Sequence, residues 1–444
     1  MADATDGGAH RLDARRLFVI ANLSILMIGL GFAIRANIAG DIQERIFAAV
    51  DLASSGNMIG GVLGATFTGF ALTLLFGSAL VDHLGMKRML LFAAFGFIAG
   101  SLIVIATSLA PPGGSSYPLI FAGFLLTGLG WGAVEAASNP LVTALFPEEK
   151  THRLNVLHAW WPAGIVIGGL LGLGLGALGV PWQWNLVILI VPAAVLALLA
   201  ARTPFPVTER VAAGVSHRDM YAEVIRSPGC FVWFGCMMLT ATTELAPGQW
   251  VNVALSNIAR MPGILVLVYV SALMFVLRHF AGRIVRHVAP VGLLWLSSLT
   301  AAVGLYLLSV AGSPVPVFVA ATVWGAGVCY MYPTMVASVA ERYPRGGAFV
   351  MGIMGFAAGM ANQVVLPIMG SIFDRARIEA AGGEEQLQQL TGAALEQVIR
   401  LASIESFRAV AVIPLLLLPV FGLIWLNDRR KRGAGARVGA PLGG

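Results

Sequence analysis

The chain has 444 residues, of which 58% are hydrophobic and 11% are charged. Soluble proteins carry about 25% charged residues, so this composition excludes a soluble globular protein and predicts an integral membrane protein. Three cysteines in apolar stretches argue against a disulfide framework. The formal net charge of +6 is interpreted as a signal of membrane topology, not of nucleic-acid binding.

Twelve apolar stretches follow one another along the chain, and a membrane-spanning helix needs about 20 apolar residues. Residues 1–16 form a polar tail. The apolar run after this tail is too long for a signal peptide, so we expect it to be retained as the first span. The predicted spans are 17–40, 55–82, 88–110, 117–145, 154–179, 182–201, 229–257, 262–287, 289–311, 315–340, 348–373 and 405–427.

The polar loop 202–227 divides these spans into two halves. We expect an all-α membrane protein with an N-terminal six-helix bundle at 17–201 and a C-terminal bundle at 228–428. A basic tail follows at 429–444. Internal duplication around a central loop is typical of transporter folds.

Basic residues fall almost entirely on one side of the predicted spans. The loops on the other side are nearly free of Lys and Arg, apart from Arg45, Arg260 and the segment 374–404. By the positive-inside rule, both termini and the loop 202–227 are predicted to face the cytoplasm. The expected location is the plasma membrane, as the inner membrane of a bacterium.

The segment 374–404 is predicted to be an external loop with an amphipathic helix on the outer mouth of the protein. The apolar residues Leu387, Leu390, Ala394 and Val398 recur there at helical spacing.

Glu135 is the only charged residue in the long apolar stretch 119–146. Burying a carboxylate in hydrocarbon is costly, so Glu135 is predicted to face a cavity, a partner or a proton path. The alternative is a carboxyl group that stays protonated and hydrogen-bonded to a neighbouring helix.

The loop between the second and third spans carries a small residue, an acid four positions later, and then a glycine and two basic residues. This pattern resembles the loop 2–3 signature of the major facilitator superfamily, with a serine in place of the family's first glycine. The resemblance implies two pseudo-symmetric six-helix bundles and alternating access. It also implies a gating role for Ser78, Asp82, Gly85, Lys87 and Arg88. An ordinary basic turn is the alternative.

A weak copy of this pattern follows the eighth span. Gly282 is followed four residues later by Arg286, and Ala289 comes three residues after that. Arg286 is therefore predicted to take part in gating in the second half.

An E-x-x-x-N-P motif begins at Glu135 on the fourth predicted helix, and an R-L-N run begins at Arg153 before the fifth. Both resemble the fucose–galactose–glucose:proton symporter family, in which the glutamate is tied to proton coupling and sugar binding. The chain departs from that family on its first helix, where the family carries an aspartate near the middle. Here Asp41 lies near the outer end and is a candidate for proton coupling.

Polar and aromatic side chains share faces on the fourth and fifth helices. Trp131, Glu135 and Asn139 lie on one face of the fourth, and His158 and Trp161 share a face of the fifth. Indole rings stack on the C–H faces of sugars, although tryptophans near helix ends also serve as interfacial anchors. Histidine titrates near physiological pH, so His158 is a candidate to couple to Glu135; a neutral structural histidine is the alternative.

Arg35 on the first helix needs a partner, and its nearest polar neighbours in sequence are Asn37 and Asp41. We expect Glu135 or Glu244 to neutralise Arg35 across the cavity, with snorkelling to the outer interface as the alternative. Arg35 and Asn37 are predicted to contact the solute.

The seventh helix is the counterpart of the first, and Pro247 on it predicts a broken segment at a cavity. Glu244 is a candidate for proton coupling. On the eleventh helix, a stripe formed by Gly352, Gly355 and Gly359 predicts close helix packing. Amide side chains offer both donors and acceptors to sugar hydroxyls. The predicted solute-binding residues of this half are Gln249, Tyr330, Asn362 and Gln363.

These features predict a secondary active transporter of a small polar solute, with a proton-coupled sugar symporter as the leading hypothesis. The alternative is a proton-coupled exporter of amphiphilic or cationic compounds. Such antiporters often carry a Gly-Pro pair on the fifth helix, which Pro162 does not form here. No nucleotide-binding loop or catalytic motif is present, so we expect neither an ATP-driven pump nor an enzyme. No metal and no cofactor are expected. The expected partners are a small solute, protons and the bilayer, without nucleic acid, and the chain is expected to act as a monomer.

Overall fold

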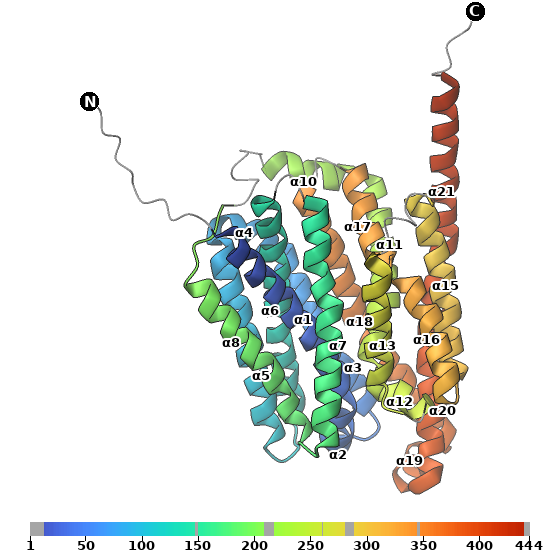
Figure 1. The fold of residues 1–444 in the computed structure, drawn as a ribbon. Coiled ribbons are helices and arrows are strands. Elements are labelled where there is room, and N and C mark those ends of the chain that lie inside the picture. The colour runs from blue at the N-terminus through green and yellow to red at the C-terminus, as the bar shows by residue number, and fades with distance from the viewer. Residues whose placement is uncertain are drawn as a thin grey trace, which may run out of the picture.

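The computed structural model describes residues 13–146, 150–207, 217–259, 261–279, 288–343 and 347–438. Within these ranges the chain is almost entirely helical and contains no β-strand. The helices stand side by side in a single bundle (Figure 1).

Six long helices make up the N-terminal half. The first begins after Asp13, whose carboxylate caps it by accepting a hydrogen bond from the Arg16 backbone N–H at 2.9 Å. These helices are α1 (Ala14–Ile42), α3 (Ser55–Leu72), α5 (Met86–Ser108), α6 (Ser116–Leu145), α7 (Lys150–Ala177) and α8 (Val187–Ala201). Shorter elements join them: η1 (Gln43–Phe47), α2 (Ala48–Val50), η2 (Thr73–Gly77), α4 (Ser78–Leu84) and η3 (Trp182–Leu186).

The C-terminal half repeats this plan with more interrupted helices. Its long elements are α11 (Pro228–Gln249), α13 (Ile264–His279), α15 (Pro290–Val310), α16 (Pro314–Val328), α17 (Met331–Arg342), α18 (Gly347–Ala381), α20 (Gly392–Ala411) and α21 (Ile413–Val438). The short elements are α10 (His217–Arg226), η4 (Val251–Leu255), α12 (Ser256–Ala259) and α19 (Glu384–Gln389). The predicted linker 202–227 is thus partly helical, through α10.

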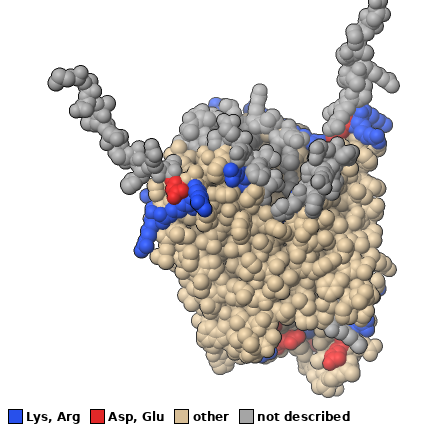
Figure 2. All heavy atoms as spheres, in the orientation of Figure 1, with Lys and Arg blue, Asp and Glu red and all other residues tan. Residues whose placement is uncertain are grey.

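The exterior suits a bilayer. In the described part of the chain, ten helical stretches are long and apolar enough to span a membrane, and Ile264–Arg278 and Pro314–Val328 are shorter apolar helices. Together they account for the twelve predicted spans. Lys, Arg, Asp and Glu gather at the two ends of the molecule and leave the broad middle free of charge (Figure 2). Bulky apolar side chains face outward from this middle, among them Phe95 at 60% exposure and Leu423 at 69%.

Two helices from opposite halves, α3 and α18, lie against each other along most of their lengths (Figure 1). Gly56 packs on Gly370, and Gly60 packs on the backbone of Leu366. A β-carbon at Gly60 would collide with that backbone, so glycine is what permits the close approach.

The predicted glycine stripe on α18 is confirmed as a packing surface. The space beside Gly352 is bounded by Ser78, and that beside Gly355 by Leu74. Gly359 lies against Ala71 and the backbone of Phe67. All of these neighbours belong to the second predicted span, so the stripe joins the two halves.

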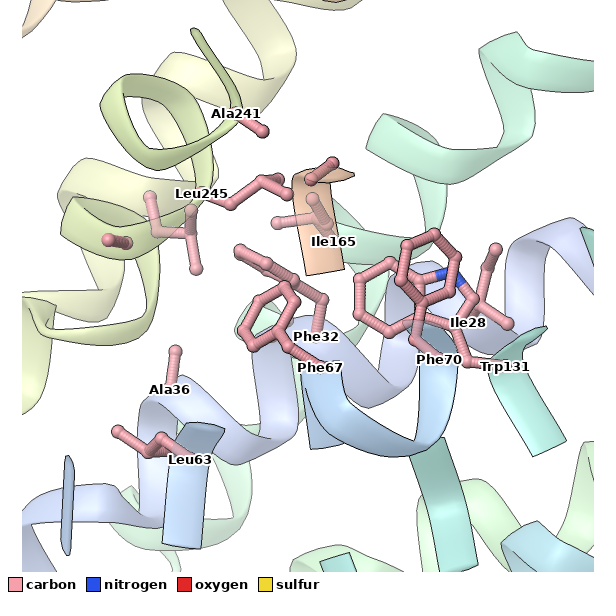
Figure 3. Close-up of a cluster of buried hydrophobic side chains, with 14 of the residues drawn as sticks. Ile28, Phe32, Ala36, Leu63, Phe67, Phe70, Trp131, Ile165, Ala241 and Leu245 are labelled. Carbon is pink, nitrogen blue, oxygen red and sulfur yellow. The ribbon is translucent and has the colours of Figure 1, made fainter. Parts of the chain in front are cut away.

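A cluster of buried apolar side chains fills the centre of the molecule (Figure 3). Phe32 of α1 and Phe67 of α3 come from the N-terminal half, and Leu245 of α11 comes from the other. The core is therefore shared between the halves.

The structure corrects the segment predicted as a loop at 374–404. Helix α18 continues to Ala381, and α20 already begins at Gly392. The expected amphipathic helix is split between α19 and α20. Leu387 and Val398 are buried as expected, but Ala394 is exposed.

The predicted break near Pro247 occurs slightly later than the proline itself. Proline has no N–H, so it leaves the carbonyl of Thr243 without its helical partner. Trp324 of α16 donates its indole N–H to that carbonyl at 3.3 Å, and α11 continues to Gln249. The π-helical turn η4 then follows.

Candidate functional site

Three polar side chains of the N-terminal half form a hydrogen-bonded chain. Asn139 Nδ2 donates to Glu135 Oε2 at 3.0 Å, which is possible because the two residues lie one turn apart on α6. His158 Nε2 lies 3.0 Å from Asn139 Oδ1. Because an amide oxygen only accepts, this geometry makes His158 the donor, with its proton on Nε2. His158 and Glu135 are thus connected through Asn139 and not by a direct hydrogen bond.

The acid of the C-terminal half has a different partner. Glu244 of α11 is buried, and its Oε1 lies 3.5 Å from Arg278 Nη2 of α13. Arg278 also donates from Nε to the carbonyl of Cys329 at 3.3 Å. Tyr332 of α17 lies within electrostatic range of both Glu244 and Glu135. The two acids therefore meet a common neighbour at the junction of the halves.

Within the described part of the chain Arg35 has no acidic partner, which contradicts the prediction that Glu135 or Glu244 would neutralise it. Its Nε, Nη1 and Nη2 atoms have no hydrogen-bond partner. The residue is 1% exposed, so it does not snorkel to an interface either. Its guanidinium carbon lies 5.6 Å from the centroid of the Trp131 ring, a cation–π contact. The prediction was wrong because the two acids have other partners. Glu135 is hydrogen-bonded to Asn139, and Glu244 is paired with Arg278.

Aromatic rings pack around Trp131, the ring that Arg35 contacts. Trp131 packs on Phe70 with ring centroids 4.5 Å apart, and Phe32 meets Trp161 edge-on at 5.4 Å. Trp131 is buried and its indole N–H has no partner. The neighbouring Trp160 is 40% exposed and faces outward.

Three amides of the C-terminal half are only half satisfied. Gln249 Nε2 donates to the carbonyl of Phe32 at 2.9 Å, which ties α11 to α1. Asn362 Nδ2 donates to the carbonyl of Ala358 at 2.9 Å. The side-chain oxygens of Gln249, Asn362 and Gln363 are buried and have no partner. By contrast, the hydroxyl of Tyr330 is engaged by the carbonyl of Leu277 at 2.9 Å.

Two other candidates from the first helix lie away from this group. Asp41 forms an ion pair with Arg45 at 2.9 Å, and its side chain is 34% exposed. Asn37 faces Gly172 of α7. Both lie toward the end of α1 that leads into η1.

The predicted gating residues surround the turn between α4 and α5. Gly85 has φ = 81°, a conformation that favours glycine, and it ends α4. Lys87 Nζ donates to the carbonyl of Ala201 at 2.7 Å, so it ties this turn to the end of α8. Ser78 lies next to Gly352 of α18, and Arg88 is exposed. The side chain of Asp82 and the whole of Arg286 lie outside the described residues.

Sequence reasoning missed Arg278. Arg278 was detectable, because it is a lone charge at the end of the apolar run Ile264–Leu277. The contact between Ser24 and Ser138, whose hydroxyls lie 2.8 Å apart, joins α1 to α6 and has no sequence signal.

The model of one protein family, described as Major Facilitator Superfamily, matches residues 17–367. A curated protein, Myo-inositol transporter 2 of Cryptococcus neoformans var. grubii, is 28% identical over 134 residues. That match spans 30% of this chain and 21% of the transporter.

Solved structures share the fold at low identity. The xylose transporter XylE from E. coli, in a partially occluded inward-open conformation, matches with a TM-score of 0.71 and 12% identity. The match covers 92% of this chain and 97% of that one. The E. coli fucose:proton symporter FucP matches with a TM-score of 0.55 and 17% identity, over 90% and 98% of the two chains. The nucleoside transporter NupG gives 0.68 and 12%, over 92% and 99%.

Proposed function

The chain belongs to the Major Facilitator Superfamily, a family of membrane transporters, and we propose that it is a proton-coupled symporter of a small sugar or sugar-like solute. The observation that carries this proposal is the chain of hydrogen bonds from Glu135 through Asn139 to His158. It places two titratable groups on one relay at membrane depth, where such groups are functional by default. Transporters of myo-inositol, xylose and fucose among the similar proteins support a polyhydroxylated solute.

The relay has a simple means of sensing a proton. While Glu135 is ionised it only accepts, so the Asn139 amide turns its NH₂ group toward Glu135 and its oxygen toward His158. Protonation makes Glu135 a donor and favours the opposite orientation of the amide. His158 must then present an acceptor nitrogen, so one proton changes hydrogen bonding on both α6 and α7. We propose that this change accompanies the switch between the two access states. We also propose that it alters the electrostatic environment of Glu244 and Tyr332 in the C-terminal half.

The solute would be held between the halves by aromatic faces and amides. Trp131 and Trp161 offer ring surfaces, and Gln249, Asn362 and Gln363 offer oxygens that have no protein partner. Sugar hydroxyls can donate to those oxygens, whose desolvation otherwise goes uncompensated.

The test is the variant Glu135→Gln in proteoliposomes, with radiolabelled D-glucose, D-glucuronate, D-xylose, L-fucose and myo-inositol as probes. Glutamine keeps the shape but cannot carry the proton, so accumulation driven by a pH gradient should be lost while exchange of the same probe persists. The matched control is Glu405→Gln, because Glu405 is an exposed carboxylate paired with Arg408 on α20. Full gradient-driven accumulation by Glu135→Gln would refute the proposed role of Glu135.

We also propose that both termini face the cytoplasm. In Figure 1 the start of α1 and the end of α21 lie at one end of the bundle, and α2 and α19 lie at the other. A cysteine at Glu385 should then react with a membrane-impermeant maleimide on intact cells, whereas a cysteine at Arg226 should not. The opposite labelling would reverse the orientation.

A further inference from the structure

The centre of the molecule holds hydrogen-bond donors without acceptors. Arg35 offers all three of its nitrogens, and Trp131 offers its indole N–H. Neither side chain contains an acceptor atom. The two lie together, with 5.6 Å between the guanidinium carbon and the ring centroid, and both are at least 95% buried.

Among the residues that the structure describes, no carboxylate is paired with Arg35. Glu135 is held by Asn139, Glu244 by Arg278 and Asp41 by Arg45. A guanidinium that is buried without an anion is strongly unfavourable, and arginine does not escape by losing its proton. The buried Arg35 guanidinium would therefore be stabilised by an anionic solute that binds during the transport cycle.

The C-terminal half carries buried acceptors without partners. Gln249 reaches across from the C-terminal half and donates to the carbonyl of Phe32, one turn before Arg35 on α1, which leaves its Oε1 without a partner. Asn362 and Gln363 on α18 also present unpartnered oxygens, and Gln363 packs against Gly64 of α3. Where α11 contacts α1, the N-terminal half offers the donors of Arg35 and Trp131, and the C-terminal half offers the amide oxygen of Gln249.

From this division we infer that the solute is a polyhydroxylated monocarboxylate, such as a hexuronate. Its carboxylate would accept a two-pronged hydrogen bond from Arg35, and its hydroxyls would donate to the amide oxygens of the other half. One free guanidinium balances one negative charge. A single carboxylate therefore fits better than a phosphate dianion, because Arg278 is already neutralised by Glu244. This inference rests on the proposed sugar transport and specifies the substrate class.

Binding to the purified protein should separate two matched pairs of probes: D-glucuronate against D-glucose, and D-galacturonate against D-galactose. Within each pair only the carboxylate replaces a hydroxymethyl group. We expect the wild-type protein to bind the acid about 100-fold more tightly than the neutral sugar, as two charge-assisted hydrogen bonds predict. In Arg35→Gln this preference should disappear, with affinity for the neutral sugar nearly unchanged. Arg35→Lys should keep part of the preference, and Arg408→Gln, an exposed arginine, should keep all of it.

The unfolding temperature of the solute-free protein shows separately whether a variant folds. Removing an unpaired buried charge should leave the solute-free Arg35→Gln protein at least as heat-stable as wild type. If Arg35→Gln does not fold, the inference is tested by the preference of the wild type and of Arg35→Lys for the acid over the neutral sugar. Equal binding of acid and neutral sugar by the wild type would overturn the inference and leave the proposed sugar transport intact. Binding of neither, nor of D-xylose, L-fucose or myo-inositol, would reject both.

Discussion

A carboxylate on α18 holds the start of α3 at the end of the molecule opposite the termini. Asp374 accepts hydrogen bonds from the backbone N–H of Gly56 at 3.1 Å and of Asn57 at 2.7 Å. Arg377 donates to Asp374 at 2.9 Å and to the hydroxyl of Ser55 at 3.3 Å. Because α3 and α18 belong to different halves, we refer to Asp374 and Arg377 with these α3 partners as the α3–α18 latch.

The variant Asp374→Asn weakens this latch by an amount that the geometry sets. A hydrogen bond to a charged group contributes about 1.5–3 kcal/mol, and a carboxylate at a helix N-terminus adds up to about 2 kcal/mol. The amide oxygen of asparagine can keep one of the two backbone contacts, but Arg377 loses its counter-ion. We therefore expect a net loss of about 3 kcal/mol, which shifts the ratio of closed to open latch on the order of 100-fold.

The assay measures the distance between spin labels at Ala49→Cys and Ala380→Cys, two exposed positions beside the latch. Asp374→Asn should add a population at longer distance, whereas the control Arg375→Gln, an exposed arginine on the same helix, should not. The double variant Asp374→Asn with Arg377→Gln should lose little more than Asp374→Asn alone, because the two residues act as a unit. An unchanged distance distribution in Asp374→Asn would show that the latch does not hold the halves together.

Two further predictions concern the contact between the halves and the buried ion pair. Gly60→Val should press α3 against the Leu366 backbone and lower stability by about 1–3 kcal/mol, seen as a lower unfolding temperature in detergent. Gly113→Ala, at a position with open space around it, should change nothing, and equal effects of the two variants would contradict the packing. Arg278→Gln should strand the buried Glu244 at a cost of about 3–5 kcal/mol, and adding Glu244→Gln should restore much of the unfolding temperature. A double variant less stable than Arg278→Gln would argue against the pair.

The helices could be predicted because hydropathy reports directly on burial in lipid. The error at 374–404 arose from the same rule. Asp374 and Arg377 were predicted to be loop residues because they are charged. In the structure they are buried in α18, where they form an ion pair and Asp374 accepts hydrogen bonds from the start of α3. A hydropathy pattern includes the charged residues but contains no information about the partners that neutralise them in the folded protein.

The sequence identified many residues of the candidate site but few of the contacts between them. Glu135 and Asn139 follow from one helical turn, so their contact was implied by spacing. The partner of Glu244 lies on another helix and depends on how α11 and α13 pack. The isolation of Arg35 depends on Glu135, Glu244 and Asp41 having other partners, which no local pattern reveals.

The first helix of each half ends in the same irregular way. Helix α1 gives way to the π-helical turn η1, and α11 gives way to the π-helical turn η4. A π turn is an α-helix with one residue too many, and its hydrogen bonds are poorer. The repeat is therefore present in backbone hydrogen bonding as well as in helix order. We therefore expect any opening of this end of the molecule to bend α1 and α11 at these corresponding turns, so that the two halves share the deformation.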